Sequence, residues 1–316
     1  MTKPCAVATP SLLARVPGVA IVLAILFVVL GLTSPSFATP ANVANILVQS
    51  TILLLLALPM TLIIMTEGLD LSMGAVLTFA SIALAITVLA TGSVSLALLA
   101  ALVVGSGFGL LNGWLVAALD IPPFIATLGT LGIAQGLSLV ATDGQSVVGI
   151  PRSIQVVYSG SMLGIPIPIV IGAVAFALLC LLLYRTRFGT YVFALGGNRE
   201  ALRLAGVPVR RMLIAVYALG GAMAGFAALL MTGRMSAAHP TAGLGLEFDA
   251  IAAVAVGGTS FERGDGWLIG TLLGVVTVGV LRNGLNLLAL PSSVQVACIG
   301  ALVIFALFVD GLRSRA

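Results

Sequence analysis

Few side chains in this sequence could do chemistry, and most of these are carboxylates and amides set among apolar residues. Glu67 and Asp70 lie in the segment EGLDLSMG at 67–74, between two long apolar runs. A carboxylate at membrane depth is costly unless it is solvated or paired. Two roles therefore fit these residues: a gate, or capping by Asp70 of a helix that starts near Leu71.

Three asparagines are expected to face the interior of the protein: Asn112, Asn283 and Asn286, with Arg282 beside Asn283. Hydrogen bonding between helices is one interpretation of these residues. Contact with a hydroxylated solute during its passage is the other, because an amide both donates and accepts hydrogen bonds. The sequence does not rank the two interpretations.

Catalysis is not indicated by any motif. A Walker A motif needs a lysine after its glycine loop, and the only lysine is Lys3, so the chain does not hydrolyse ATP by itself. The only histidine is His239, in a predicted outer loop, and no paired aspartates fall within facing apolar runs. We therefore expect no enzyme activity, no metal and no organic cofactor.

The composition indicates the fold class. Charged residues make up 8% of the chain, against roughly 25% in a soluble domain, and 60% of residues are hydrophobic. The net charge of +4 would suggest nucleic acid in a soluble protein. Here the basic residues sit at the ends of apolar runs, where they orient a membrane protein, so no nucleic-acid partner is expected. We predict an all-α, polytopic integral membrane protein in contact with lipid.

Ten apolar runs are candidates for transmembrane helices, each needing about 20 residues to cross about 30 Å. They lie near 17–33, 46–65, 73–90, 95–118, 123–141, 167–184, 212–232, 248–258, 266–289 and 294–310, and the eighth is short. We expect one transmembrane domain over 17–310, a cytoplasmic segment 1–16 and a cytoplasmic tail 311–316.

The basic residues favour ten crossings that start in the cytoplasm. This arrangement places eleven of them inside and only Arg152 and Arg234 outside, with Arg282 within a run. Such asymmetry in short loops is typical of the positive-inside rule. Both termini are therefore predicted to be cytoplasmic.

Small residues recur at four-residue spacing in several runs, notably Gly105, Gly109 and Gly113, and Gly221 with Gly225. Burial of apolar area does not drive helices together in lipid, so close backbone packing must do so. We expect these glycines to lie where two helices touch.

One polar segment, 185–211, interrupts the apolar sequence with six arginines and one glutamate. Within it, Asn198 can cap a short helix, Gly206 can end that helix in a left-handed turn, and Pro208 prevents its continuation. A helix this short cannot cross a membrane. We expect it to lie in the cytoplasm, where a partner protein docks.

Five segments in this order give the chain a resemblance to the permease subunits of bacterial ribose-type ABC sugar importers. They are EGLDLSMG at 67–74, PPFIATLGT at 122–130, GTYVFALGGNREALRLAGVPV at 189–209, LEFDAIAAVAVGGTSFERGDGWLIGTLLG at 246–274 and VLRNGLNLL at 280–288. The resemblance spans about residues 40 to 310. The family usually has glycine at position 67 and small residues at positions 262, 263 and 265.

The resemblance implies an importer permease of the bacterial inner membrane that moves a small polar solute, such as a monosaccharide. It implies three partners: a separate ABC ATPase, a second permease subunit that is either the same or a homologous chain, and a periplasmic solute-binding protein. The family's ATPase-coupling helix corresponds here to Gly197, Asn198, Glu200, Ala201, Leu204, Ala205 and Gly206.

The alternative function is a secondary transporter driven by an ion gradient. Such a protein needs ionisable residues near the middle of the bilayer. Arg282 is the only ionisable residue that we interpret as well inside a run, while Glu67, Asp70 and Asp310 lie near run ends. This distribution favours the ATP-driven importer.

Overall fold

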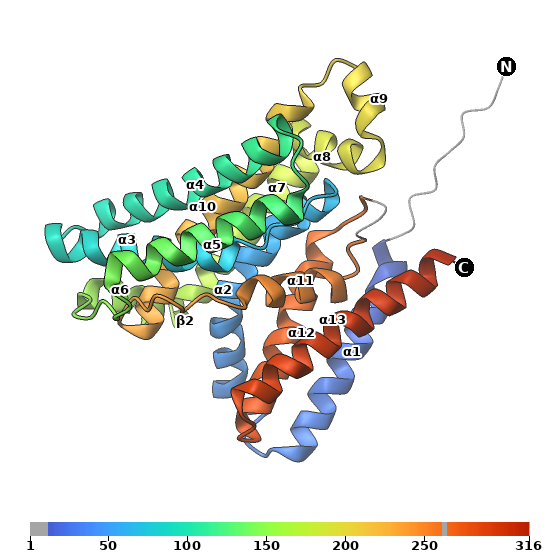
Figure 1. Cartoon of the computed structure of the whole chain (residues 1–316). Helices are drawn as coiled ribbons and strands as arrows, with labels where there is room; N and C mark the ends of the chain where they lie inside the picture. Colours follow the sequence, from blue (N-terminus) through green and yellow to red (C-terminus); the bar gives the residue numbers. More distant parts are fainter. Residues whose placement is uncertain (1–11, 261–263, 316) are drawn as a thin grey trace.

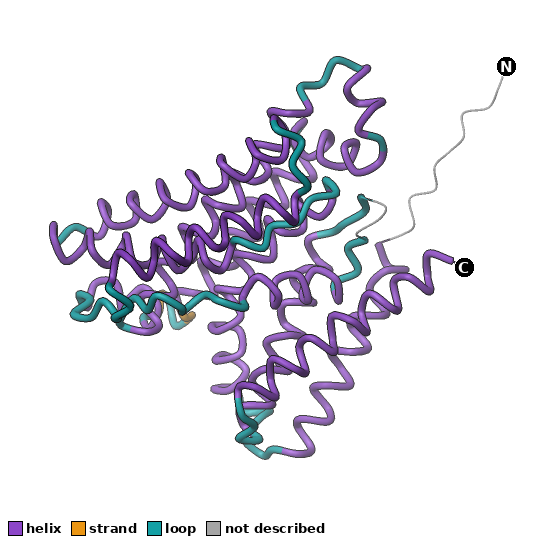
Figure 2. Tube along the Cα trace, in the orientation of Figure 1, coloured by secondary structure: helices purple, strands orange, loops and turns teal. Residues whose placement is uncertain are grey.

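Helices account for nearly all regular structure in the computed structural model, which describes residues 12–260 and 264–315 (Figures 1 and 2). The elements are α1 (Leu12–Thr33), α2 (Pro40–Met65), α3 (Met73–Thr91), α4 (Val94–Ala118), α5 (Pro123–Thr142), α6 (Arg152–Ser159), β1 (Ser161–Met162), β2 (Ile165–Pro166), α7 (Ile167–Arg185), α8 (Arg187–Gly197), α9 (Arg199–Leu204), α10 (Val209–Met235), α11 (Leu246–Val256), α12 (Leu268–Leu287) and α13 (Ser292–Arg315). The two strands form a small antiparallel pair. Most of the predicted N-terminal segment, and positions 262 and 263, lie outside the described residues.

Seven of the described helices are long and apolar enough to cross a membrane: α2, α3, α4, α5, α7, α10 and α12. Each coincides with one of the predicted apolar runs. Shorter apolar helical stretches occur at Gly18–Thr33 in α1 and at Ser292–Leu302 in α13. The prediction of an all-α membrane protein with many spanning helices is confirmed.

The eighth predicted run, 248–258, was the short one, and the structure gives it a helix too short to cross a membrane by itself. Its helix, α11, has 11 residues and extends only about 16 Å at 1.5 Å per residue. The chain then leaves the helix at Gly257, and Thr259 and Ser260 are buried in non-helical conformation. The glycines of the GGTS segment end the apolar helix early, so α11 is a short helix inside the bundle.

The helices form two arms that diverge from α2 (Figure 1). One arm holds α3, α4, α5 and α10, and the other holds α1, α12 and α13, while α11 lies between them. Every residue of α2 from Thr51 to Met65 is buried. A helix that is apolar all round and buried on every side is typical of the centre of a bundle.

The α4–α10 contact joins two backbones without intervening side chains. A Cβ atom on Gly109 would overlap the carbonyl oxygen of Tyr217, and one on Gly105 would overlap that of Gly221. Gly225 is similarly close to Ala101. The predicted close packing at these glycines is confirmed, and it holds the first arm together.

Substitution at this contact tests its contribution to stability. We expect Gly109→Leu to lower the free energy of unfolding by about 1–3 kcal/mol, because the added side chain forces α4 and α10 apart. Gly107→Leu is the matched control, since Gly107 is on the same helix with open space around it. Thermal unfolding in detergent compares the two, and equal melting temperatures would contradict the prediction.

Candidate functional site

A short exposed helix, α9, stands out from the rest of the protein (Figure 1). The Asn198 side-chain oxygen accepts a hydrogen bond from the Ala201 backbone N–H at 2.8 Å. Gly206 follows the helix with a φ of 79°, a conformation that favours glycine. The predicted cap and the predicted left-handed turn are both confirmed.

The surface of α9 combines an apolar side chain with a fixed pair of charges. Leu204 is 79% exposed, and no residue of the helix is buried. Glu200 and Arg203 form an exposed ion pair at 2.7 Å. The hydrogen bond from Arg203 to Glu200, together with the carboxylate charge, raises the pKa of Arg203.

Helix α8, which the sequence analysis did not predict, connects α9 to the interior. A Cβ atom on Gly196 would overlap the carbonyl oxygen of Met65 at the end of α2, and it would lie 2.5 Å from the Cα atom of Gly264. The backbone N–H of Leu268, at the start of α12, donates to the Tyr184 hydroxyl at 3.1 Å. The chain before α9 therefore touches the end of α2 and the segment that leads into α12.

A buried polar network occupies the break between α2 and α3. One carboxylate oxygen of Asp70 accepts hydrogen bonds from the Ser72 backbone N–H at 2.8 Å and from its hydroxyl at 2.6 Å. The Asn112 amide of α4 donates to the Ser72 hydroxyl oxygen at 2.8 Å. The Thr130 hydroxyl of α5 donates to the Asn112 side-chain oxygen at 2.6 Å. Three helices are thus joined by polar contacts.

The prediction that Asp70 directly caps a helix near Leu71 is wrong in detail. Helix α3 begins at Met73, and Ser72 occupies the capping position without a side-chain cap. Asp70 instead bonds to Ser72 two residues later, which stabilises the turn before the helix. Burial raises the pKa of the Asp70 carboxyl, against the lowering effect of the hydrogen bonds from Ser72 and Asn112.

The other predicted path residues lie away from this network. Glu67 is exposed, with a φ of 59° that disfavours any residue bearing a Cβ atom. Asn283 exchanges two hydrogen bonds with Asn42, at 2.9 and 3.0 Å, and so joins α12 to α2. Asn286 is exposed and accepts a hydrogen bond from Gln295 at 2.8 Å. The structure therefore brings Asp70 and Asn112 together, and it separates the other three.

An ion pair between α11 and α12 was missed in the sequence analysis. Asp249 and Arg282 approach within 2.6 Å, and their side chains are 5% and 39% exposed. They line a small hollow of about 50 Å³ together with Gln49, Ser50 and Arg234, and the other lining residues are apolar; we call this hollow the polar recess after its polar side. Each residue could be found in the sequence, since Asp249 lies within the predicted run 248–258 and Arg282 had been singled out, but their pairing could not.

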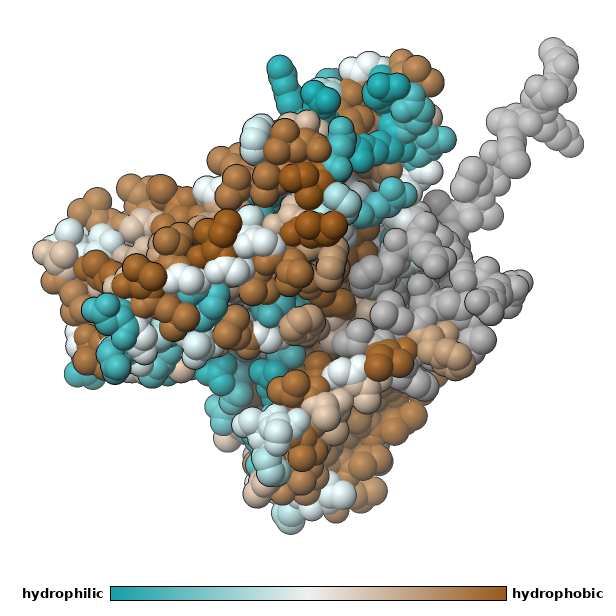
Figure 3. All heavy atoms as spheres, viewed as in Figure 1, coloured by the Kyte–Doolittle hydropathy of each residue, from teal (hydrophilic) through white to brown (hydrophobic). Residues whose placement is uncertain are grey.

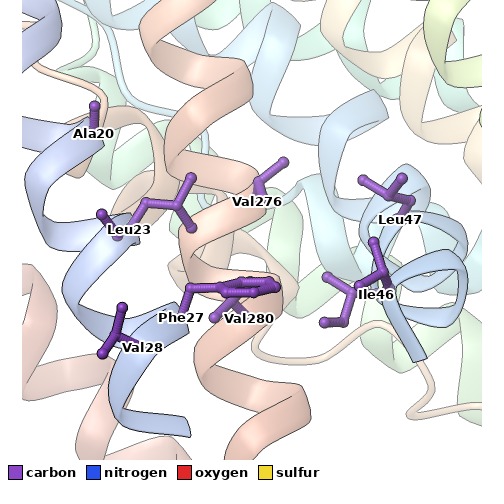
Figure 4. A pocket seen from close by; sticks show the side chains of 10 residues that line it. Ala20, Leu23, Phe27, Val28, Ile46, Leu47, Val276 and Val280 are labelled. Atoms are coloured by element: carbon purple, nitrogen blue, oxygen red, sulfur yellow. The ribbon is translucent and has the colours of Figure 1, made fainter. Parts of the chain in front are cut away.

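A larger hollow between α1, α2 and α12 is wholly apolar (Figure 4). It has a volume of about 470 Å³, and its lining includes Leu23, Phe27, Ile46 and Val280. A hydroxylated solute there would lose its hydrogen bonds to water and gain none in return. This hollow is therefore unsuited to a sugar.

Comparisons with known proteins give a consistent result. A family profile described as the permease component of the branched-chain amino acid transport system matches residues 42–307. The ribose import permease protein RbsC of Bacillus subtilis (strain 168) is 39% identical, over 92% of this chain and 91% of that protein. The D-allose transport system permease protein AlsC of Escherichia coli (strain K12) is 35% identical, over 94% and 92%. No solved structure matches the chain.

The buried network can be tested by removing its central amide. We expect Asn112→Ala to lower the free energy of unfolding by about 1–3 kcal/mol, since the Ser72 and Thr130 hydroxyls both lose a buried partner. Asn45→Ala, at an exposed position of α2, is the control and should have little effect. An unchanged melting temperature for Asn112→Ala in detergent would show that the network is not structural.

The backbone conformation at Glu67 gives a second prediction. Glu67→Gly should stabilise the protein by about 1 kcal/mol, because glycine adopts this φ without a steric penalty. Glu67→Ala should give no comparable gain, since its Cβ atom remains. Equal stabilisation by both substitutions, measured by thermal unfolding, would instead assign the effect to loss of the charge.

Proposed function

Because the chain belongs to the family of permease components of the branched-chain amino acid transport system, we propose that it is the membrane subunit of an ATP-driven importer. The solute is a monosaccharide or a similar small polar molecule. The observation that carries this proposal is the similarity, over more than nine-tenths of the chain, to permeases whose names specify ribose import and D-allose transport.

The proposed partners follow from what the chain lacks and what it exposes. Hydrolysis of ATP requires a separate ATPase subunit, since the sequence has no lysine that could complete a Walker A motif. The exposed side of α9, with Leu204, is the surface that we assign to that ATPase. A second permease subunit and a periplasmic solute-binding protein complete the complex.

We place the protein in the bacterial inner membrane with ten crossings and both termini in the cytoplasm. In this topology of ten crossings, α11 and the buried stretch after it together form one crossing, part of which is not helical. Broken helices of this kind line the substrate path in other transporters. In this arrangement α8, α9, the start of α1 and the end of α13 face the cytoplasm, which agrees with the distribution of arginines.

The proposed mechanism begins at α9. Closure of the ATPase pair around ATP moves the surface on which α9 rests, and the Asn198 cap keeps this short helix from fraying during that movement. The movement passes through α8 to the end of α2, from which the arms diverge, and to the segment that leads into α12, because Gly196 touches Met65 and Gly264. The arms then change their separation, and the solute path opens on one side at a time.

Purification in mild detergent with the proteins encoded in neighbouring reading frames tests the energy source. We expect an ATPase to co-purify and ribose, allose or arabinose uptake in proteoliposomes to require ATP and a binding protein. An ion-gradient-driven transporter would instead come away alone, and ionophores would abolish its uptake.

The role of α9 gives a separate prediction. Leu204→Glu should lower ATP-driven uptake at least tenfold, because it places a charge in the proposed interface, and the protein should still reach the membrane. Leu163→Glu, at a 95% exposed leucine between β1 and β2, is the matched control and should retain uptake. Normal uptake by Leu204→Glu would remove α9 from the ATPase interface.

A further inference from the structure

We propose that the polar recess contacts the solute and that the Asp249–Arg282 ion pair closes it; this inference rests on the proposed function. The recess lies between α2, α10, α11 and α12, where the two arms meet. Figure 3 shows hydrophilic atoms in the notch between the arms, although most of the surrounding surface is hydrophobic.

The position of the recess in the chain places it far from α9. Arg234 is in the last turn of α10, whose first turn follows α9, and α10 has 27 residues, or about 40 Å. Ser50 lies in the first half of α2, and Arg282 lies in the second half of α12. In the proposed topology this is the side on which a periplasmic binding protein delivers the solute.

The size of the recess indicates a closed state. A volume of about 50 Å³ holds one or two water molecules, each taking about 30 Å³ in the liquid. Sites for small molecules usually have volumes of about 300–1,000 Å³. The recess must therefore widen before a monosaccharide can enter, and the ion pair joins two of the helices that line it, α11 and α12.

The chemistry of the lining suits a neutral solute rich in hydroxyl groups. Asp249 is an acceptor, Arg282 and Arg234 are donors, and Gln49 and Ser50 can do both. Two polar atoms here have no hydrogen-bond partner within the described chain: the buried Ser50 hydroxyl and the Nε atom of Arg282. Buried polar groups without partners are unfavourable, so these atoms are available to bind a ligand.

Opening of the ion pair would affect the side chains of Asp249 and Arg282 differently. Arg282 is 39% exposed and can turn toward water, whereas Asp249 is 5% exposed and would be left buried without its partner. An isolated buried carboxylate is strongly disfavoured. Hydroxyl groups of a sugar that donate to Asp249 would replace the lost guanidinium, so arrival of the solute favours opening of the pair.

A purely structural ion pair is the alternative explanation, and it predicts a different response to a neutral replacement. Apolar side chains of similar size often replace a buried ion pair without loss of stability. The double variant Asp249→Leu/Arg282→Met should therefore fold in either case. It lacks every group that could hydrogen-bond a sugar at these two positions.

The test measures ribose, allose and arabinose uptake by the reconstituted complex. For the double variant we expect a wild-type melting temperature, co-purification of the ATPase, and uptake at least tenfold slower than wild type. Thr277→Val is the control on the same helix, because the Thr277 hydroxyl bonds to the Leu273 carbonyl of α12 itself, and it should stay within twofold. Uptake within twofold by the double variant would overturn the inference.

A second variant keeps the inference testable if the double variant does not reach the membrane. Asp249→Asn/Arg282→Gln removes both charges but retains hydrogen-bonding groups, and we expect it to change the order of preference among the three sugars. An unchanged order at unchanged rates would overturn the inference. Failure of the wild-type complex to import any of the sugars would instead overturn the proposed function.

Discussion

The Asp70 carboxylate provides a hydrogen-bond acceptor for a backbone N–H group that is buried at a break between two helices. Where α2 ends and α3 begins, the chain leaves helical geometry at a buried position, and its free N–H groups need partners. Asp70 accepts from the Ser72 N–H and hydroxyl, and Asn112 and Thr130 extend these bonds to α4 and α5. The position of the whole first arm depends on this break being satisfied.

The second break, after α11, is subject to the same requirement that buried backbone groups at a helix end have hydrogen-bond partners. The Trp267 indole N–H donates to the Gly257 carbonyl at 2.8 Å, where the helix ends. The Thr259 N–H donates to the Val254 carbonyl at 3.2 Å. Two apolar helices thus end inside the bundle with their backbone groups paired. The two breaks also lie against each other, since a Cβ atom on Gly266 would lie 2.6 Å from the Met65 side chain.

Local features of the structure could be predicted from the sequence because their causes are local. Continuous apolar runs identified the seven spanning helices, and the spacing of Gly105 and Gly109 identified a close helix contact. Asn198 and Gly206 identified the ends of α9, since a cap and a left-handed turn depend on residues within one helical turn.

Features that depend on a distant partner could not be predicted. Arg282 was recognised as unusual, but nothing in an apolar run specifies that its partner is Asp249 on another helix. Asn283 and Asn112 look alike in sequence, yet one pairs with Asn42 and the other with Asp70 through Ser72. Helix α11 was taken as a span because hydrophobicity reports burial, and burial in protein resembles burial in lipid.

The contact of Gly196 with Met65 and Gly264 has a mechanical consequence. Where long side chains separate two elements, a change of rotamer can absorb a small displacement of one element before the other moves. Here the backbone at Gly196 contacts the backbone at Met65 and Gly264 directly, so no side chain can absorb a displacement. A displacement of α8 would therefore pass directly to the end of α2 and to the segment that leads into α12.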